Sequence, residues 1–129
     1  MAKKVLVIED SRNIVAVVKI ALEACGYEVK VAQDGVAAME EVFASRPDLI
    51  LLDLVIPKMD GFMVLEGLKK EEKTRNIPVI VISAKAAEED IKRARELGAS
   101  EYMVKPFNPE ELRGTVAKVL GQRPLFGGD

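Results

Sequence analysis

The sequence contains no histidine and only one cysteine, and both absences narrow the chemistry open to the chain. Without an imidazole side chain, any reaction that needs histidine chemistry must borrow it from a partner. Because Cys25 is alone, it cannot form an internal disulfide, which is typical of the reducing cytoplasm, and we expect a cytoplasmic protein. Cys25 lies on the apolar stripe of a predicted helix, so we interpret it as a packing residue.

Long hydrophobic runs and dense basic segments are also missing. No apolar stretch approaches the length of a membrane span, and the first residues lead directly into a predicted strand, so we expect neither membrane insertion nor a signal peptide. The net charge is −2, which argues against direct nucleic-acid binding by this chain. The 129 residues, 49% hydrophobic and 31% charged, fit one globular domain with a proper core.

Four short apolar segments, rich in valine and isoleucine, each end on a chemically useful residue. They are residues 5–8 before Glu9 and Asp10, residues 49–52 before Asp53, residues 79–82 before Ser83, and residues 102–104 before Lys105. Continuous apolar runs of this kind indicate strands that are buried on both faces, as in parallel sheets. Since parallel strands all end at one edge, three acids, a hydroxyl and an ammonium are predicted to converge there.

Helical patterns lie between these strands. The predicted N-caps are Ser11, Asp34, Asp60 and Asn108, and the predicted helix stops include Gly26, Gly98 and Gly121. We expect the helix from Asp34 to bury Val36, Met39 and Phe43, and we predict a fourth helix over residues 86–97. Residues 28–32 alternate apolar and polar side chains, as a half-exposed edge strand does. Five strand–helix units therefore predict a parallel sheet with helices on both faces.

The order of these motifs resembles the receiver domain of bacterial response regulators. The motifs are Glu9-Asp10, the segment from Asp53 to Gly61, Ser83-Ala84 and Lys105-Pro106, and the resemblance covers about residues 3–120. It implies a doubly wound, flavodoxin-like (βα)5 fold, with a five-stranded parallel sheet of order 2-1-3-4-5. We expect a receiver domain over residues 1–121. Residues 122–129 are interpreted as a tail or as the start of a linker.

The same resemblance implies a metal-dependent phosphoacceptor site. Asp53 is expected to be the nucleophile that forms an acyl phosphate. Asp10, Asp53 and the backbone carbonyl of Val55 are expected to bind Mg²⁺ directly, while Glu9 acts through water.

Four further residues receive roles in this way. Ser83 and Lys105 are expected to contact the phosphoryl oxygens, where the ammonium would balance charge in the transition state. Tyr102 and Ser83 would form the switch, and Pro106 is expected to follow a cis peptide bond. Two simpler interpretations stay open: Ser83 as the cap of helix 86–97, and Tyr102 as a half-buried edge residue.

The implied role is signalling. We expect the chain to catalyse only its own phosphorylation and dephosphorylation, and not to act as a metabolic enzyme. The implied partners are a sensor histidine kinase or phosphotransfer protein and an unidentified output protein, the latter bound through helix 86–97, the strand around Tyr102 and the helix from Pro109. The chain is expected to be a monomer or a phosphorylation-dependent dimer.

Three other classes compete with this interpretation. A phosphatase of the haloacid-dehalogenase type also uses a strand-end aspartate with Mg²⁺, but it requires a second aspartate where this chain has Val55. A flavodoxin-like cofactor binder is disfavoured because the acidic segment Glu9-Asp10-Ser11 would repel a phosphate. An inactive scaffold of the same fold is disfavoured because the set of site residues is complete.

Overall fold

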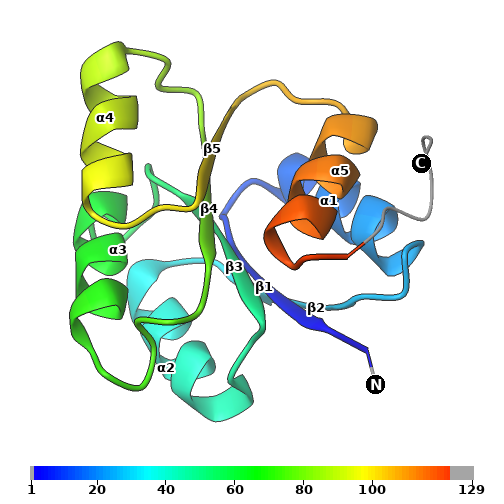
Figure 1. The fold of residues 1–129 in the computed structure, drawn as a ribbon, viewed down its shortest axis with the longest axis horizontal. Coiled ribbons are helices and arrows are strands. Elements are labelled where there is room, and N and C mark those ends of the chain that lie inside the picture. Colours follow the sequence, from blue (N-terminus) through cyan, green and yellow to red (C-terminus); the bar gives the residue numbers. More distant parts are fainter. Residues whose placement is uncertain (1, 123–129) are drawn as a thin grey trace.

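The computed structural model describes residues 2–122, in which five strands alternate with five helices (Figure 1). The strands are β1 (Lys4–Ile8), β2 (Glu28–Ala32), β3 (Leu49–Asp53), β4 (Val79–Ser83) and β5 (Glu101–Val104). The helices are α1 (Arg12–Glu23), α2 (Gly35–Ser45), α3 (Gly61–Lys70), α4 (Glu88–Glu96) and α5 (Pro109–Val119). All neighbouring strands are parallel, in the order β2-β1-β3-β4-β5, which confirms the predicted fold.

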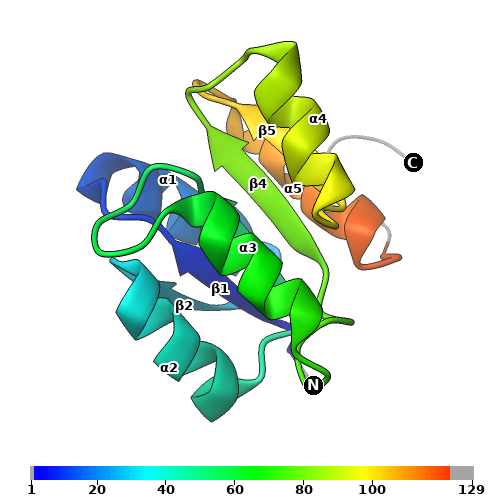
Figure 2. The same cartoon turned by 90° about the vertical axis from the view of Figure 1, so that its left-hand side faces the viewer.

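The sheet separates two apolar cores. One core lies under α1 and α5, and the other under α2, α3 and α4, so that the three central strands are covered on both faces (Figures 1 and 2). Side chains of β1 alternate between them: Leu6 and Ile8 face one core, Val5 and Val7 the other. Full coverage is the reason why β1, β3 and β4 are apolar along their length, whereas the edge strand β2 alternates between buried and exposed residues, as predicted.

The predicted buried face of α2 is wrong. Val36 and Phe43 are 48% and 46% exposed, and only Met39 of the predicted set packs partly against the core. Ala38 and Val42 face the sheet instead. The short side chain of Ala38 allows the helix to lie close to the strands. A hydrophobicity pattern does not show which face of a helix can pack closest to the sheet.

Helix ends agree with the predictions to within a few residues. Ser11, Asp34, Asp60 and Asn108 each accept a backbone N–H of the first turn, as expected for N-caps. Helix α4 is shorter than predicted, because its cap position holds an alanine that has no side-chain acceptor. Of the predicted tail, only Gln122 belongs to the described residues. None of the helices described in residues 2–122 is long and apolar enough to cross a membrane.

The loop that joins β3 to α3 closes tightly at Gly61. The Gly61 N–H donates to the carbonyl oxygen of Leu54 at 3.1 Å, and Asp60 Oδ1 accepts the N–H of Phe62 at 2.7 Å. A Cβ added at Gly61 would lie 2.4 Å from the Leu54 Cα. Glycine is therefore required here by the approach of two backbones, and this approach fixes the chain just after Asp53.

A matched pair of alanine variants tests this close approach. Gly61→Ala is expected to lower the free energy of unfolding by about 1–3 kcal/mol, because the new methyl group must displace backbone. Gly67→Ala, in open space on the same helix, is expected to raise it by about 0.5–1 kcal/mol, because alanine has the higher helix propensity. Urea denaturation measures both. Changes of the same sign in the two variants would contradict the steric explanation.

Candidate functional site

Three acidic side chains meet where β1 and β3 end. Ile8 pairs with Leu52 in the parallel register, so Glu9 and Asp53 leave the sheet side by side, and Asp10 follows. One carboxylate oxygen from each of Glu9, Asp10 and Asp53 lies within 4.8 Å of the others. Glu9 and Asp53 are only 1% and 4% exposed, whereas Asp10 is open to solvent. Oxygen ligands that leave room for water fit Mg²⁺.

Lys105 reaches into this group from the loop after β5. Its Nζ lies 2.7 Å from Glu9 Oε1 and 3.0 Å from Asp53 Oδ2. The side chain crosses from the end of β5 past β4 to β3, a distance that its length allows. The peptide bond between Lys105 and Pro106 is cis, as the resemblance implied. The closer of its two ion pairs is the one to Glu9. This was not predicted, because the sequence does not show which carboxylate of the site lies nearest to the lysine.

Burial and ion pairing have opposite effects on the pKa values of Glu9 and Lys105. Burial raises the pKa of Glu9, and the hydrogen bonds from Lys105 and from the Ser11 N–H only partly offset this. Burial alone would lower the pKa of Lys105, but its hydrogen bonds to Glu9 and Asp53 outweigh that effect and raise it. The ammonium therefore stays charged, and within the part of the chain that the structure describes it is the one cation paired with the three acids. A divalent cation at this site would neutralise the remaining charge.

The backbone holds the carboxylate of Asp53 in place. The Val55 N–H donates to Asp53 Oδ1 at 3.0 Å, while Lys105 binds Oδ2. The side chain of Val55 is 61% exposed. Metal binding by the Val55 carbonyl, and the action of Glu9 through water, stay predictions.

Ser83 and Tyr102 are both bonded to the main chain of Lys85. Ser83, the last residue of β4, is fully buried, and its Oγ accepts the Lys85 N–H at 3.1 Å. Helix α4 begins at Glu88 after Ala87, so Ser83 does not cap it. The half-buried Tyr102 donates its hydroxyl to the Lys85 carbonyl at 2.8 Å, and burial raises its pKa. The two predicted switch residues are thus linked through one residue.

Phe62 makes a contact that sequence reasoning missed. The guanidinium of Arg93 in α4 lies 4.1 Å from the centre of the Phe62 ring, and Lys85 Nζ lies 5.8 Å from it. Phe62 is buried at the start of α3, but its cationic partners are distant in the sequence, so no local pattern could identify them. The stacking ties α4 to the start of α3.

The sequence matches the family of response regulator receiver domains over residues 5–117. The chain belongs to this family. The receiver domain is 39% identical over 120 residues to the alkaline phosphatase synthesis transcriptional regulatory protein PhoP of Bacillus subtilis, covering 93% of this chain and 49% of that protein. It therefore spans about half the length of the curated relatives it matches.

Solved receiver structures share the fold and include metal-bound forms. One is the receiver domain of a sensor histidine kinase from Pseudomonas aeruginosa PAO1 with a magnesium ion in its active-site cleft, at 28% identity and a TM-score of 0.85, covering 95% of this chain and all of that one. Another is the Mn²⁺-bound response regulator Rcp1, at 30% identity and a TM-score of 0.84, covering 97% of this chain and 99% of that one. The acidic cluster of this receiver domain is consistent with a phospho-aspartate pocket that binds a divalent metal.

Proposed function

We propose that Asp53 accepts a phosphoryl group from a phosphohistidine of a sensor histidine kinase or phosphotransfer protein. The observation that carries this proposal is the convergence of Asp53 with Glu9, Asp10 and Lys105 at one edge of the sheet. The chain has no histidine of its own, so the donor imidazole belongs to the partner. Such a chain acts as a cytoplasmic signalling protein and catalyses only its own phosphorylation and dephosphorylation.

In the proposed transfer, a carboxylate oxygen of Asp53 forms a bond to phosphorus while the phosphorus–nitrogen bond of the donor breaks, and the imidazole leaves with a proton. Lys105, already at the carboxylate, would stabilise the charge on the phosphoryl oxygens. Ser83, at the end of the neighbouring strand, would donate its hydroxyl to one of them. Asp10, Asp53 and the carbonyl of Val55 would hold Mg²⁺, with Glu9 acting through water; the bound ion neutralises phosphoryl charge.

The haloacid-dehalogenase alternative finds no support in this site. Its second aspartate would serve as an acid–base group two residues after the nucleophile, and the exposed Val55 side chain has no proton to give. The proposed function is therefore that of a switch, with the phosphorylated state as its product.

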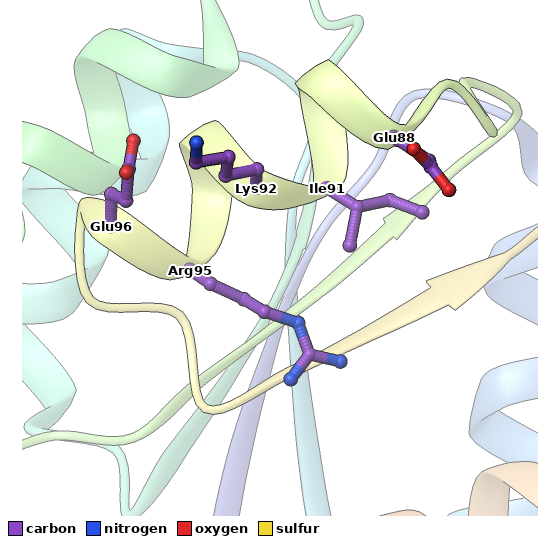
Figure 3. Close-up of a pocket in the computed structure, with 5 residues that line it drawn as sticks. All are labelled: Glu88, Ile91, Lys92, Arg95 and Glu96. Atoms are coloured by element: carbon purple, nitrogen blue, oxygen red, sulfur yellow. The ribbon is translucent and has the colours of Figure 1, made fainter.

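We assign the output face to α4, β5 and α5. Helix α4 buries only Ala94, so little apolar area opposes its movement. A shallow hollow of about 440 Å³ lies along this helix. Figure 3 shows the side chains that line it, with the half-buried Ile91 among charged neighbours. The hollow is lined by Glu88, Ile91, Lys92, Arg95 and Glu96. An output protein, or a second phosphorylated copy, would bind here; unphosphorylated, the chain would be a monomer.

Phosphotransfer from a purified histidine kinase tests the proposal. The kinase is first labelled with radioactive ATP and freed of nucleotide, and this chain is then added with Mg²⁺. We expect label to leave the kinase and appear on the chain within seconds for a cognate pair, and excess EDTA to prevent the transfer. A panel in which no kinase transfers label, together with no labelling by acetyl phosphate, would refute the proposal.

Val55 is expected to protect the acyl phosphate. By resemblance, its side chain lies on the path of the hydrolytic water, and valine cannot orient that water by a hydrogen bond. Val55→Asn should therefore shorten the lifetime of the phosphorylated state by about threefold to tenfold, the effect of one hydrogen bond. Lys85 borders the same opening and is left unchanged. Loss of label with time measures the rate, with Val36→Asn on α2 as the control. Equal lifetimes in Val55→Asn and the unaltered chain would contradict this role.

Arg93 is expected to restrain α4 through Phe62. Arg93→Gln removes the stacking contact, worth about 1 kcal/mol, and should speed amide hydrogen exchange in α4 about fivefold. Arg95→Gln is the control and should leave exchange unchanged, because it neutralises an arginine of the same helix that lines the hollow along α4 and is not stacked on Phe62. Equal acceleration in both variants would mean that helix charge, and not stacking, holds α4.

A further inference from the structure

A second hollow lies at the opposite edge of the sheet from Asp53, where the strands begin. It is enclosed between the C-terminal end of α2 and the segment of residues 71–77 that leads from α3 to β4, and its volume is about 500 Å³. The lining residues are Val42, Phe43, Arg46, Pro47, Lys73, Thr74 and Ile77. None of them belongs to the phosphoacceptor site or to the output face, so the proposed phosphotransfer leaves this hollow without a role.

Hydrogen bonds fix the wall formed by residues 71–77. Thr74 is 2% exposed, and its Oγ1 donates to the Leu68 carbonyl at 2.6 Å. Lys69 Nζ donates to the carbonyl oxygens of Ile77 at 2.7 Å and Arg75 at 3.1 Å. These bonds anchor the segment to α3 at both ends. The hollow is therefore formed before any ligand arrives, and binding would not require the segment to become ordered.

The lining combines an apolar surface with unpaired positive charge. Val42 forms a buried floor, and the ring of Phe43 is 46% exposed beside it. Arg46 and Lys73 are exposed, and in the described part of the chain neither side chain takes part in an ion pair or hydrogen bond. Nearby Glu71 and Glu72 are exposed but do not line the hollow. A ligand would therefore meet an aromatic face and two free cations together.

The backbone of Arg46 has a conformation that is uncommon for a residue other than glycine. Arg46 has φ 49° and ends α2 in the left-handed region, where glycine or asparagine is favoured because an L side chain is strained. Arg46 lines the hollow together with Phe43, which lies about one turn of helix earlier.

We propose that this hollow binds a small amphipathic anion. Its planar apolar part would pack on Phe43, Val42 and Ile77, and its carboxylate, sulfonate or phosphate group would lie between Arg46 and Lys73. The volume lies within the range of about 300–1,000 Å³ that is usual for small-molecule sites. The ligand would be an organic acid or phosphate with an aromatic or similarly flat body.

Titration with 8-anilinonaphthalene-1-sulfonate, an amphipathic anion, tests the site by amide chemical shifts of the ¹⁵N-labelled chain. We expect saturable shifts confined to residues 42–47 and 73–77. The uncharged counterpart N-phenyl-1-naphthylamine and inorganic sulfate should each bind roughly tenfold more weakly or worse, because each lacks one half of the interaction. Shifts centred elsewhere, no saturation, or equal binding of the uncharged compound would each overturn the proposal.

Variants assign the binding to individual side chains. Phe43→Ala and Lys73→Gln are each expected to weaken probe binding by roughly tenfold. Arg46→Gly should do the same while relieving the left-handed backbone, so a loss of binding cannot be attributed to unfolding. Val36→Ala removes another exposed apolar side chain of α2 outside the hollow and should leave the affinity unchanged. Unaltered affinity in all three hollow variants would overturn the proposal.

Discussion

Asp53→Asn is expected to abolish phosphorylation of the chain. The amide keeps the size and shape of the carboxylate but is not a nucleophile toward phosphorus. It also removes the charge that Lys105 binds at 3.0 Å, and with it one of the carboxylates that are proposed to hold Mg²⁺. Incubation with acetyl phosphate and Mg²⁺, followed by intact mass measurement, should show one added phosphoryl group on the unaltered chain and none on the variant.

A neighbouring aspartate provides the matched control for this experiment. Asp60 lies in the same loop but serves as the N-cap of α3, where it accepts the Phe62 N–H, and asparagine caps helices about as well as aspartate. Asp60→Asn should therefore be labelled like the unaltered chain. Undiminished labelling of Asp53→Asn at another residue would show that the nucleophile has been misassigned. Loss of label in both variants would indicate damage to the loop and not to the chemistry.

Mg²⁺ is expected to raise the melting temperature of the chain. One carboxylate oxygen from each of three acids lies within 4.8 Å of the others, and among residues 2–122 only the cation of Lys105 is in hydrogen-bond contact with them. Like charges at this distance are unfavourable. A cation that binds only the folded state stabilises it by about 2.7 kcal/mol at one hundred times its dissociation constant. For a domain of this size, that corresponds to a rise of roughly 5–15 °C.

Asp10→Ala separates specific binding from a general effect of salt. Asp10 is the exposed member of the cluster, so its removal should leave the fold intact while taking away one metal ligand. We expect the variant to lose most of the rise with Mg²⁺, and its melting temperature without metal to stay equal or increase, because one repulsive charge is gone. Asp60→Asn again serves as the control and should respond like the unaltered chain. Equal shifts in Asp10→Ala and the unaltered chain would contradict a site at Asp10.

The features that could be predicted from the sequence are those fixed by local rules. An apolar run that ends on Asp53 predicts a buried strand, and it also predicts the edge of the sheet at which Asp53 lies. Asp60 followed by Gly61 indicates a helix N-cap and a place where two backbone segments lie close together. The strand order required the resemblance, because runs of similar composition do not specify which strands pair. Once the order is known, the reach of Lys105 to Asp53 follows from the spacing of strands.

The features that could not be predicted depend on packing between distant segments. Phe43 is more hydrophobic than Ala38, yet Ala38 faces the sheet, because the distance between helix and sheet decides which face fits. The stacking of Arg93 on Phe62 joins α4 to α3, and neither residue carries a local sign of its partner. The first helical residue of α4 was also missed, since Ala87 gives no capping signal.

The main chain and the side chain of Lys85 make separate contacts. Ser83 and Tyr102 are both bonded to its main chain, through its N–H and its carbonyl oxygen, which every residue except proline provides in the same way. Its side chain makes one long contact, 5.8 Å from the Phe62 ring. A substitution of Lys85 by any residue except proline would therefore keep the donor and the acceptor that bind Ser83 and Tyr102, and would alter only the contact with the Phe62 ring.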